Sequence, residues 1–295
     1  MYYNEKSQVY FNGRFVMANE VKTDLYTQTL HYGNGVFEGI RSYDTPDGVR
    51  IFKAKDHFER LKYSAEKMHI PFTYSIEELE TITYELLEKN KLKDAYIRPL
   101  MYLGANMSLT PTKEVHLVIM AWEWEKYLGD SLLRVCESSF QRPNPKSCWV
   151  EAKVVGHYTN SILATTEAKQ KGFDEALLTD ADGFVAEGPG ANFFYEKDGK
   201  LYTPKLGNIL PGITRQTVLE IASELDIEVE EKLFPIEDVF SADIAFFCGT
   251  AAEVIGIKQL NDYIFPMKWE ESNSYLIQRK YKRKVAQNEY QSYCI

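Results

Sequence analysis

The run Ala95-Tyr96-Ile97-Arg98-Pro99-Leu100-Met101-Tyr102 is followed along the chain by Val115-His116-Leu117-Val118-Ile119-Met120-Ala121-Trp122. Both runs are largely apolar, which is typical of strands buried in a sheet. Two helical patterns come before them. The first begins near Asp56 and repeats apolar residues at helical spacing, and the second begins with a capping box formed by Ser75 and Glu78. The first part of the chain is therefore predicted to be α+β.

Two strand pairs are predicted ahead of these helices. Asn12-Gly13 separates two apolar arms within Val9–Val16, which is a strong hairpin signal. A second pair is predicted over Gly35–Tyr43 and Val49–Phe52, joined by a turn that contains Pro and Gly. The sheet of the first part should therefore contain strands from both pairs.

The second part of the chain alternates helices with short strands. Helices are predicted over about 160–171, where Gly172 serves as the C-cap, and over about 214–225. The predicted strands are Glu175–Thr179, Gly183–Glu187, Asn192–Glu196, Lys200–Thr203 and Ile244–Cys248. The pattern weakens between Trp124 and Gln141, so we place the domain boundary there. The prediction is a small α+β domain over 1–124 and a larger mixed α/β domain over 125–295.

Composition excludes several classes of partner. The 295 residues carry a formal net charge of −9, whereas binding to nucleic acid or to an anionic membrane requires a basic surface. The four cysteines have no CxxC spacing, and the first residues lack the apolar run of a signal peptide. No run of apolar residues is long enough for a membrane span. We expect a soluble cytoplasmic protein, without a metal site because the five histidines are scattered.

Two loops are suited to binding phosphate. Leu210-Pro211-Gly212-Ile213-Thr214-Arg215 leads directly into a predicted helix, so free backbone amides and the helix dipole would face an anion. Phe247-Cys248-Gly249-Thr250-Ala251-Ala252 ends a strand in a turn of small residues and offers a hydroxyl group. Each loop alone also has a plain structural explanation, as a capped Pro-Gly turn or as a crowded strand end.

Two charged residues stand at unusual places. Glu187 ends a predicted strand beside two glycines, where a carboxylate is usually solvated. Lys153 interrupts an apolar run, where a lysine is more often an edge-strand charge than a nucleophile. Residue chemistry alone does not distinguish Lys153 from the other lysines of the chain.

Taken in order, these segments resemble the class IV aminotransferases, which are fold type IV enzymes dependent on pyridoxal 5'-phosphate (PLP), and the branched-chain transaminases in particular. The resemblance covers roughly Val9 to Ile257, and several motifs in one order are more specific than any of them alone. The matching pieces are His31-Tyr32-Gly33, Val36-Phe37-Glu38-Gly39-Ile40-Arg41, His57-Phe58-Glu59-Arg60-Leu61, Tyr96-Ile97-Arg98-Pro99-Leu100, Lys153 to Tyr158, Gly172-Phe173-Asp174-Glu175-Ala176, Glu187-Gly188-Pro189-Gly190-Ala191-Asn192-Phe193-Phe194, Leu210 to Arg215, and Gly249-Thr250-Ala251-Ala252-Glu253.

The resemblance implies a PLP site and a role for each matching residue. Lys153 matches the catalytic lysine that binds the cofactor covalently and moves a proton between the substrate Cα and the cofactor C4′. Glu187 matches the acid that faces the pyridine nitrogen, and Tyr158 the tyrosine bonded to the phenolic oxygen. The phosphate group would be held by four further matches, which are Arg60, Ile213, Thr214 and Thr250.

The resemblance also implies the substrate pocket. Tyr96 and the turn that contains Ala251 and Ala252 match groups that hold the α-carboxylate, and Arg98 matches the arginine for the distal carboxylate of glutamate. The apolar walls around a branched side chain would be formed by Tyr32, Phe37, Trp124, Tyr127 and Tyr158. The Tyr96 and Arg98 pair favours branched-chain substrates with 2-oxoglutarate over the alternatives, a D-amino acid transaminase or an aminodeoxychorismate lyase.

Some positions depart from the family pattern. His157 and Ala191 replace the usual Asn and Glu, the segment after Ile257 differs, and so does the loop Ala105–Pro111. These departures bear on the side-chain preference of the substrate pocket. The resemblance implies a homodimer, alone or within a larger assembly of dimers, with Ala105–Pro111 lining the neighbouring subunit's pocket. Leu276–Val285 is expected to be a basic helix.

Overall fold

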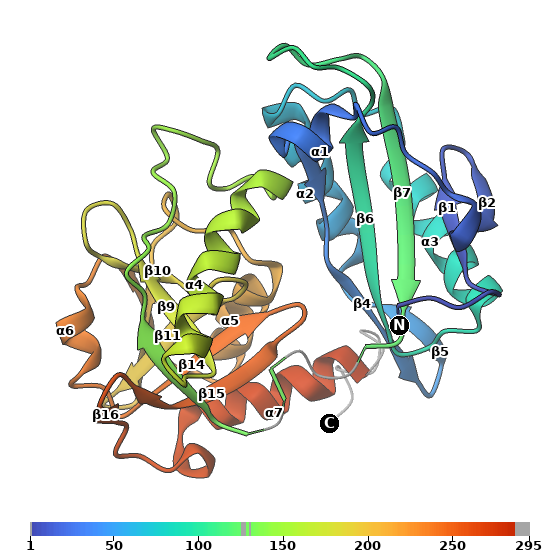
Figure 1. The fold of residues 1–295 in the computed structure, drawn as a ribbon. Coiled ribbons are helices and arrows are strands. Elements are labelled where there is room, and N and C mark those ends of the chain that lie inside the picture. Colours follow the sequence, from blue (N-terminus) through green and yellow to red (C-terminus); the bar gives the residue numbers. More distant parts are fainter. Residues whose placement is uncertain (1, 125–127, 130, 287–295) are drawn as a thin grey trace. The chain divides into compact units, whose positions relative to one another are not determined.

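The computed structural model describes residues 2–124, 128–129 and 131–286 (Figure 1). The chain divides into two compact units. One contains the described residues of 1–125 together with Ala152–His157, and the other contains the described residues of 126–151 and of 158–295. The mixture of helices and strands confirms the predicted α+β class.

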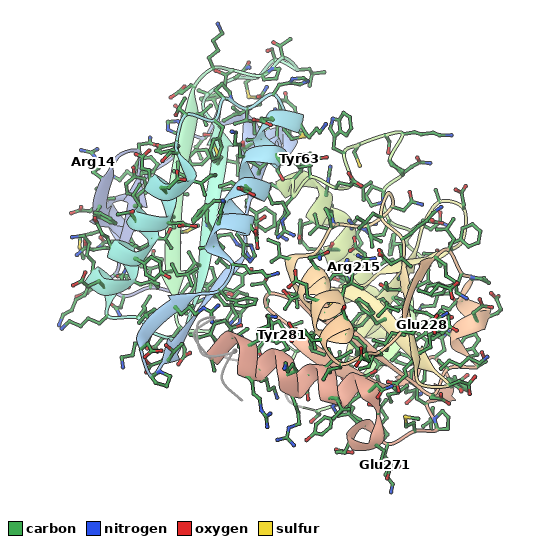
Figure 2. The ribbon with its side chains drawn as sticks, turned by 180° about the vertical axis from the view of Figure 1, so that it is seen from behind. Arg14, Tyr63, Arg215, Glu228, Glu271 and Tyr281 are labelled. Atoms are coloured by element: carbon green, nitrogen blue, oxygen red, sulfur yellow. The ribbon has the colours of Figure 1, made fainter. Side chains whose placement is uncertain are left out.

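The first unit is an antiparallel sheet with helices on one face. Its strand order is β2-β1-β7-β6-β4-β5, with β3 also paired to β6. Figure 2, the view from behind, shows the two long helices in front of the sheet. The strands are β1 Gln8–Phe11, β2 Arg14–Met17, β3 Gly35–Phe37, β4 Ile40–Thr45, β5 Gly48–Ile51, β6 Ala95–Leu103 and β7 Val115–Trp122, and the helices are α1 Gln28–Tyr32, α2 Ala54–Lys67 and α3 Ile76–Asn90, with a 3-10 turn at Ala18–Glu20.

The core of the first unit lies between these helices and the sheet. Phe58 and Leu61 of α2 and Leu79 and Leu86 of α3 are fully buried, and they pack with strand residues such as Ile97. These apolar residues recur at helical spacing because the sheet covers one side of each helix. Ser75 is confirmed as the N-cap of α3, where the amide of Glu78 donates to the Ser75 hydroxyl at 3.0 Å.

The predicted hairpin is confirmed. Asn12 and Gly13 both have positive φ angles, 47° and 92°, as a two-residue turn between twisted strands requires. The second prediction needs a correction, since Gly35–Tyr43 is not one strand. It is divided into β3 and β4 at Glu38-Gly39, where the Glu38 side chain bonds to α2 rather than lying on the sheet face.

The second unit contains a mixed sheet. Its strand order is β10-β9-β8-β15-β14-β11-β12-β13, with β16 paired to β15. Strand β8 runs parallel to both β9 and β15. The strands are β8 Leu133–Glu137, β9 Glu175–Thr179, β10 Val185–Glu187, β11 Asn192–Lys197, β12 Lys200–Pro204, β13 Val229–Lys232, β14 Ile244–Gly249, β15 Glu253–Leu260 and β16 Tyr263–Ile264, and the helices are α4 Tyr158–Gln170, α5 Ile213–Glu224, α6 Ile236–Val239 and α7 Asn273–Ala286, with 3-10 turns at Val155–His157 in the first unit and Trp269–Glu271 in the second.

Two elements differ from what the sequence indicated. Strand β8 lies in the stretch where the sequence pattern weakens, and its five residues are held between two long-range neighbours. The segment Ala152–His157, which the sequence analysis placed in the second domain, belongs to the first unit. There Val154 pairs with Val36, and the amide of Gly156 donates to the carbonyl oxygen of Gly33 at 3.1 Å. The chain therefore returns to its first unit for these six residues before α4 begins.

The basic C-terminal helix is confirmed as α7. Its buried residues Ile277, Tyr281 and Val285 recur at helical spacing, and the helix packs against β15 and α5. Within the described part of the chain, no helix combines the length and the apolar composition that a membrane crossing requires.

Candidate active site

Lys153 lies in an extended segment of the first unit. Its backbone is fixed at both ends, because its amide donates to the Ser64 hydroxyl of α2 at 2.9 Å and its carbonyl oxygen accepts from the amide of Phe37 at 3.1 Å. The half-buried side chain places Nζ 4.9 Å from the centre of the Phe37 ring. Lys153 is therefore not an edge-strand charge, since helix α2 and the last residue of β3 both hold its position.

Phe37 also contacts a second cation. The guanidinium carbon of Arg98 lies 4.6 Å from the ring centre, on β6. Nη2 of Arg98 donates to the Tyr96 hydroxyl at 3.1 Å, whereas its buried Nε has no hydrogen-bond partner among the described residues. An aromatic face attracts cations, so Phe37 holds both Lys153 and Arg98 beside an apolar surface. Such a surface favours a ligand that has both an apolar part and an anionic part.

The Tyr96 side chain has close neighbours on several sides. Its ring packs edge-on against Trp124, with ring centres 4.4 Å apart, and it also contacts Trp122. Gly39 leaves the space that the hydroxyl occupies, because a Cβ atom at that position would come 2.1 Å from the Tyr96 oxygen. A glycine between β3 and β4 is therefore a steric requirement of this site.

Arg60 of α2 is held by a buried carboxylate. Its Nε and Nη2 donate to Oε1 and Oε2 of Glu38, at 2.7 and 2.9 Å, and His57 Nδ1 lies 2.7 Å from Oε2. Burial alone would raise the pKa of Glu38, but the charge of Arg60 and the bond to His57 outweigh it and hold that pKa well below its usual range. Burial lowers the pKa of His57, and the charges of Arg60 and Lys153 add to this effect while Glu38 opposes it.

The second unit fixes another buried carboxylate. Oε1 of Glu187 lies 3.0 Å from Nε of Arg142 and accepts from the amide of Leu210, and Oε2 accepts from the side-chain amide of Asn192 at 3.0 Å. Glu187 is 4% exposed, so it is not the solvated rim residue that its place at a strand end suggests. The sequence analysis gave no role to Arg142 or Asn192. For Asn192 the signal was its place in the motif that follows Glu187.

The amino end of α5 lies beside this carboxylate. Gly212 is the N-cap and offers no side chain, so the first amides of the helix have no partner within it. A Cβ atom on Gly212 would come 1.9 Å from the side-chain oxygen of Asn192, and Nδ2 of the same side chain donates to the carbonyl oxygen of Leu210. Asn192 therefore links Glu187 to the turn that presents Ile213 and Thr214. Arg215 is bonded to the Pro204 carbonyl oxygen and to Glu231.

Thr250, Ala251 and Ala252 form the turn between β14 and β15. Gly249 packs against Gly190 and Ala191, and a Cβ atom added to Gly249 would lie only 3.1 Å from the Gly190 carbonyl oxygen. The turn ends at Glu253, which has a positive φ of 55°. Because Gly190 lies in the loop that connects Glu187 to Asn192, the small-residue turn and the acid of β10 are at the same edge of this sheet.

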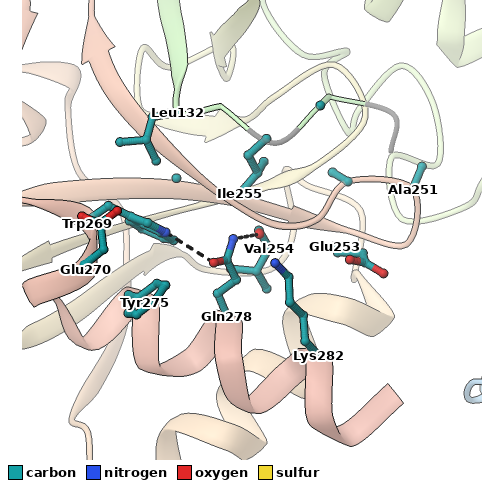
Figure 3. Close-up of a pocket in the computed structure, with 13 residues that line it drawn as sticks. Leu132, Ala251, Glu253, Val254, Ile255, Trp269, Glu270, Tyr275, Gln278 and Lys282 are labelled. Atoms are coloured by element: carbon teal, nitrogen blue, oxygen red, sulfur yellow. Dashed lines mark hydrogen bonds between the residues drawn. The ribbon is translucent and has the colours of Figure 1, made fainter. Parts of the chain in front are cut away.

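A pocket of about 240 Å³ lies beside the same turn (Figure 3). Ala251 and Ala252 line it together with Trp269, Gln278 and Lys282. The side-chain amide of Gln278 donates to the Val254 carbonyl oxygen at 2.7 Å and accepts from the Trp269 indole at 3.4 Å. Helix α7 thus fastens the start of β15, next to the turn.

The remaining predicted site residues are tyrosines. Tyr158 is the first residue of α4. Tyr32 ends α1, is 46% exposed and donates to the Met107 carbonyl oxygen at 3.2 Å. Tyr127 lies outside the described residues. The structure thus groups Phe37, Tyr96, Arg98, Trp124 and Lys153 in the first unit, and Glu187, Ile213, Thr214 and the turn after β14 in the second.

Comparison with known proteins identifies the family. The family model described as amino-transferase class IV matches residues 35–260. The chain belongs to the class IV aminotransferases. This family assignment covers Lys153, Glu187 and both glycine-containing turns. Among the described residues of this class IV aminotransferase, no three His, Cys, Asp or Glu side chains are grouped to hold a metal ion.

Similar proteins include enzymes from several organisms. A branched-chain-amino-acid aminotransferase of Pseudomonas aeruginosa is 42% identical over 259 residues, which are 86% of this chain and 84% of that protein. The enzyme of the same name from Escherichia coli K12 is 37% identical over 261 residues, with the same coverage of 86% and 84%. The crystal structure of a branched-chain aminotransferase from Thermoproteus uzoniensis with norvaline has a TM-score of 0.91 at 37% identity, covering 95% of each chain. An Escherichia coli structure has a TM-score of 0.92 at 33% identity, covering 97% of this chain and 98% of the other.

We predict that Gly39→Ala lowers both stability and transaminase turnover. The new methyl group would displace the Tyr96 ring, which is itself only 6% exposed, and overpacking of this kind costs about 1–3 kcal/mol. Chemical denaturation should show the loss of stability. Gly190→Ala is the matched control for stability, because its Cβ would meet no atom within 4 Å. Equal unfolding free energies for the two variants would contradict the steric argument.

Proposed function

We propose that this class IV aminotransferase transfers amino groups between branched-chain amino acids and 2-oxoglutarate by means of PLP. The enzymes described above support the substrate class through their names. A solved branched-chain aminotransferase of similar fold contains pyridoxamine 5'-phosphate, and another contains N-(5'-phosphopyridoxyl)-L-glutamate. The observation that carries the proposal is the position of Arg98, whose buried Nε has no partner beside the aromatic surface of Phe37 and Tyr96.

The residues present fit PLP. The cofactor carries a phosphate group, a pyridine nitrogen and an aldehyde, and the chain offers a matching group for each. Helix α5 begins with a glycine N-cap and unpaired first amides, as an anion requires, Glu187 is a buried and fully bonded carboxylate, and Lys153 supplies a primary amine. When bound, PLP supplies a protonated ring that accepts electron density from the α-carbon of an amino acid.

Lys153 holds the cofactor covalently and transfers the proton. Its amine would hold the cofactor at the aldehyde carbon C4′ and would carry the proton that moves between the substrate Cα and C4′. The backbone bonds of Lys153 to Ser64 and Phe37 fix the start of its side chain, which limits the positions that the amine can take.

Glu187 keeps the pyridine nitrogen protonated. An ionised carboxylate favours a proton on a neighbouring basic nitrogen, and the ion pair with Arg142 and the hydrogen bonds from Asn192 and Leu210 hold the Glu187 carboxylate in place. Tyr158 would bond to the phenolic oxygen of the ring. Four groups would bind the phosphate through charge-assisted and backbone hydrogen bonds, and they are Arg60, the amides of Ile213 and Thr214, and the Thr250 hydroxyl.

The substrate is held at both ends. Tyr96 and the turn at Ala251 and Ala252 would bind the α-carboxylate, which leucine and glutamate share. The far end differs, because a branched side chain is apolar and the glutamate side chain ends in a carboxylate. Phe37, Tyr32, Trp124, Tyr127 and Tyr158 would form the apolar walls. Arg98 would pair with the distal carboxylate, while its aliphatic stem still packs beside leucine.

We propose that the functional unit is a homodimer in the cytoplasm, where unpaired cysteines persist. The side chains of Leu25, Leu30 and Leu109 are 76%, 63% and 87% exposed. They lie on α1, the residues before it and the loop Ala105–Pro111. The side-chain amide of Gln28 fastens this loop to α1, donating to the carbonyl oxygens of Ser108 and Thr110. An ordered surface with this many exposed apolar side chains fits a second copy of the chain.

Lys153→Ala should abolish turnover and the visible absorbance of bound cofactor, because no other amine would bond to C4′. Glu187→Gln should retain the cofactor and lose most of its rate, because a neutral amide no longer keeps the ring nitrogen protonated. Absorbance spectra and steady-state rates test both. A borohydride-reducible adduct in the alanine variant would show that Lys153 is not the attachment point, and a normal rate in the glutamine variant would remove Glu187 from its role.

Arg98→Met should slow the half-reaction with glutamate much more than the half-reaction with leucine. The distal carboxylate of glutamate would lose a charge-assisted bond, which is worth about 1.5–3 kcal/mol, while the contact with leucine remains. We expect the selective loss in kcat/KM for glutamate to be at least about tenfold. Single-turnover rates with leucine and with glutamate on one preparation measure it. Equal losses for both substrates, together with a lower melting temperature, would indicate a structural role for Arg98.

Replacing an exposed leucine of the proposed interface should separate the dimer. Leu109→Asp would place a charge in the apolar contact, so sedimentation velocity should show a shift from dimer to monomer at assay concentration. The matched control is Ile264→Asp, because Ile264 is 61% exposed on β16 of the second unit and should not affect assembly. A fully active monomer of the unaltered chain would contradict the proposed unit.

A further inference from the structure

Two buried residues of the first unit have no role in the proposed reaction. Glu38 follows β3, its carboxylate is 0% exposed, and His57 of α2 is 2% exposed at its side chain. A buried carboxylate is costly unless it is paired. Here the pairing is complete, since Oε1 accepts from Arg60 Nε, and Oε2 contacts Arg60 Nη2, His57 Nδ1 and the amide of Gly39.

Helix α2 brings these groups to one face. His57, Arg60 and Ser64 are separated by three and then four residues, so their side chains leave the helix on the same side. The first two bond to Glu38, and the Ser64 hydroxyl accepts from the backbone amide of Lys153. The same helix face therefore holds the carboxylate and the segment of the amine proposed to bind the cofactor.

We propose that Glu38 is a positioning residue for the phosphate group of the cofactor and acts through Arg60. The carboxylate binds two of the three guanidinium nitrogens at once, which fixes the plane of the group and the direction of its Nη1 edge. His57, bonded to the same oxygen as Nη2, keeps the carboxylate from rotating. The inference rests on the proposed function, because it assumes that Arg60 binds the phosphate.

The charge balance supports this role. Arg60 and Lys153 are two cations of this region, and Glu38 neutralises the charge of Arg60. Burial favours the uncharged acid, but Arg60 and His57 outweigh it and hold the pKa of Glu38 low. His57 has a lowered pKa, chiefly because of burial, so at neutral pH it bonds to Glu38 as a neutral ring. Arg60 thus faces its ligand with a fixed orientation rather than as a mobile surface charge.

A purely structural ion pair makes a different prediction. If Glu38 served only to hold α2 on the sheet, its loss would weaken every ligand of the site by a similar factor. If it orients Arg60 for phosphate, the loss concerns only ligands that carry that group. Pyridoxal lacks the phosphate of PLP and otherwise has the same ring and aldehyde, so the pair of ligands separates the two roles.

The test is a titration of the cofactor-free full-length chain with PLP and with pyridoxal, followed by absorbance. For Glu38→Gln we expect PLP to bind at least about tenfold more weakly, as for the loss of a charge-assisted contact, and pyridoxal to change by less than about twofold. Glu175→Gln is the matched control, since Glu175 is also buried but bonds to the Thr165 hydroxyl and the Ala176 amide. It should bind both ligands as the unaltered chain does.

A second pair of variants keeps the test decisive if Glu38→Gln does not fold. Glu38→Asp retains the charge and withdraws it by one methylene, so it should also weaken PLP selectively. In an Arg60→Met background, the further change at Glu38 should cost no additional selectivity for PLP over pyridoxal. Equal losses for the two ligands, or none, would overturn the role of Glu38. Failure of the unaltered chain to bind PLP would instead overturn the proposed function.

Discussion

The first unit depends on the buried carboxylate of Glu38, which requires positive partners within a few ångströms. Arg60 supplies the positive charge from α2, and His57 of the same helix adds a hydrogen bond from its neutral ring, so the carboxylate ties the helix to the sheet. Removing one partner of a buried ion pair typically costs about 3–5 kcal/mol, more than most single contacts in a core. The interruption between β3 and β4 follows, since a side chain bonded to the helix cannot also continue the strand. Gly39 then leaves the space that Tyr96 occupies.

The second unit uses the same principle with different partners. Glu187 is paired with Arg142, which comes from the loop before α4, and with Asn192 on the neighbouring strand. Asn192 has a further function, since its oxygen lies where a side chain on Gly212 would be. The acid of β10 and the amino end of α5 are therefore fixed by one amide side chain. Helix α7 adds support from another side, where Gln278 bonds to β15 just beyond the small-residue turn.

The pairing of Glu38 and Glu187 explains how charged side chains can be buried in both units. Each carboxylate accepts several hydrogen bonds, and each is matched by an arginine, so the charges are present without an uncompensated cost. Arg98 differs from these carboxylates, because its buried Nε has no hydrogen-bond partner among the described residues and no carboxylate is paired with it there. An unsatisfied donor of this kind is consistent with a position that a ligand anion completes. The carboxylates are thus held by several partners, whereas Arg98, the residue proposed to meet the substrate, keeps an unsatisfied donor.

The sequence by itself determined the features that depend on neighbours in the chain. The Asn12-Gly13 hairpin, the capped start of α3, strands β6 and β7 and the basic C-terminal helix were all predictable, because turn chemistry and apolar periodicity act over a few residues. Individual site residues such as Lys153 were predictable only through the family resemblance. Local pattern did not separate this lysine from the others.

The tertiary structure alone decided the features that depend on distant partners. Strand β8 exists because β9 and β15 flank it, and Ala152–His157 joins the first unit because Val154 pairs with Val36. The roles of Glu38 and Arg142 also became visible only there, since their partners lie 22 and 45 residues away along the chain. A short segment has too little periodicity to predict such pairings. The burial of a charged residue cannot be predicted from its neighbours in the chain, because distant residues enclose it.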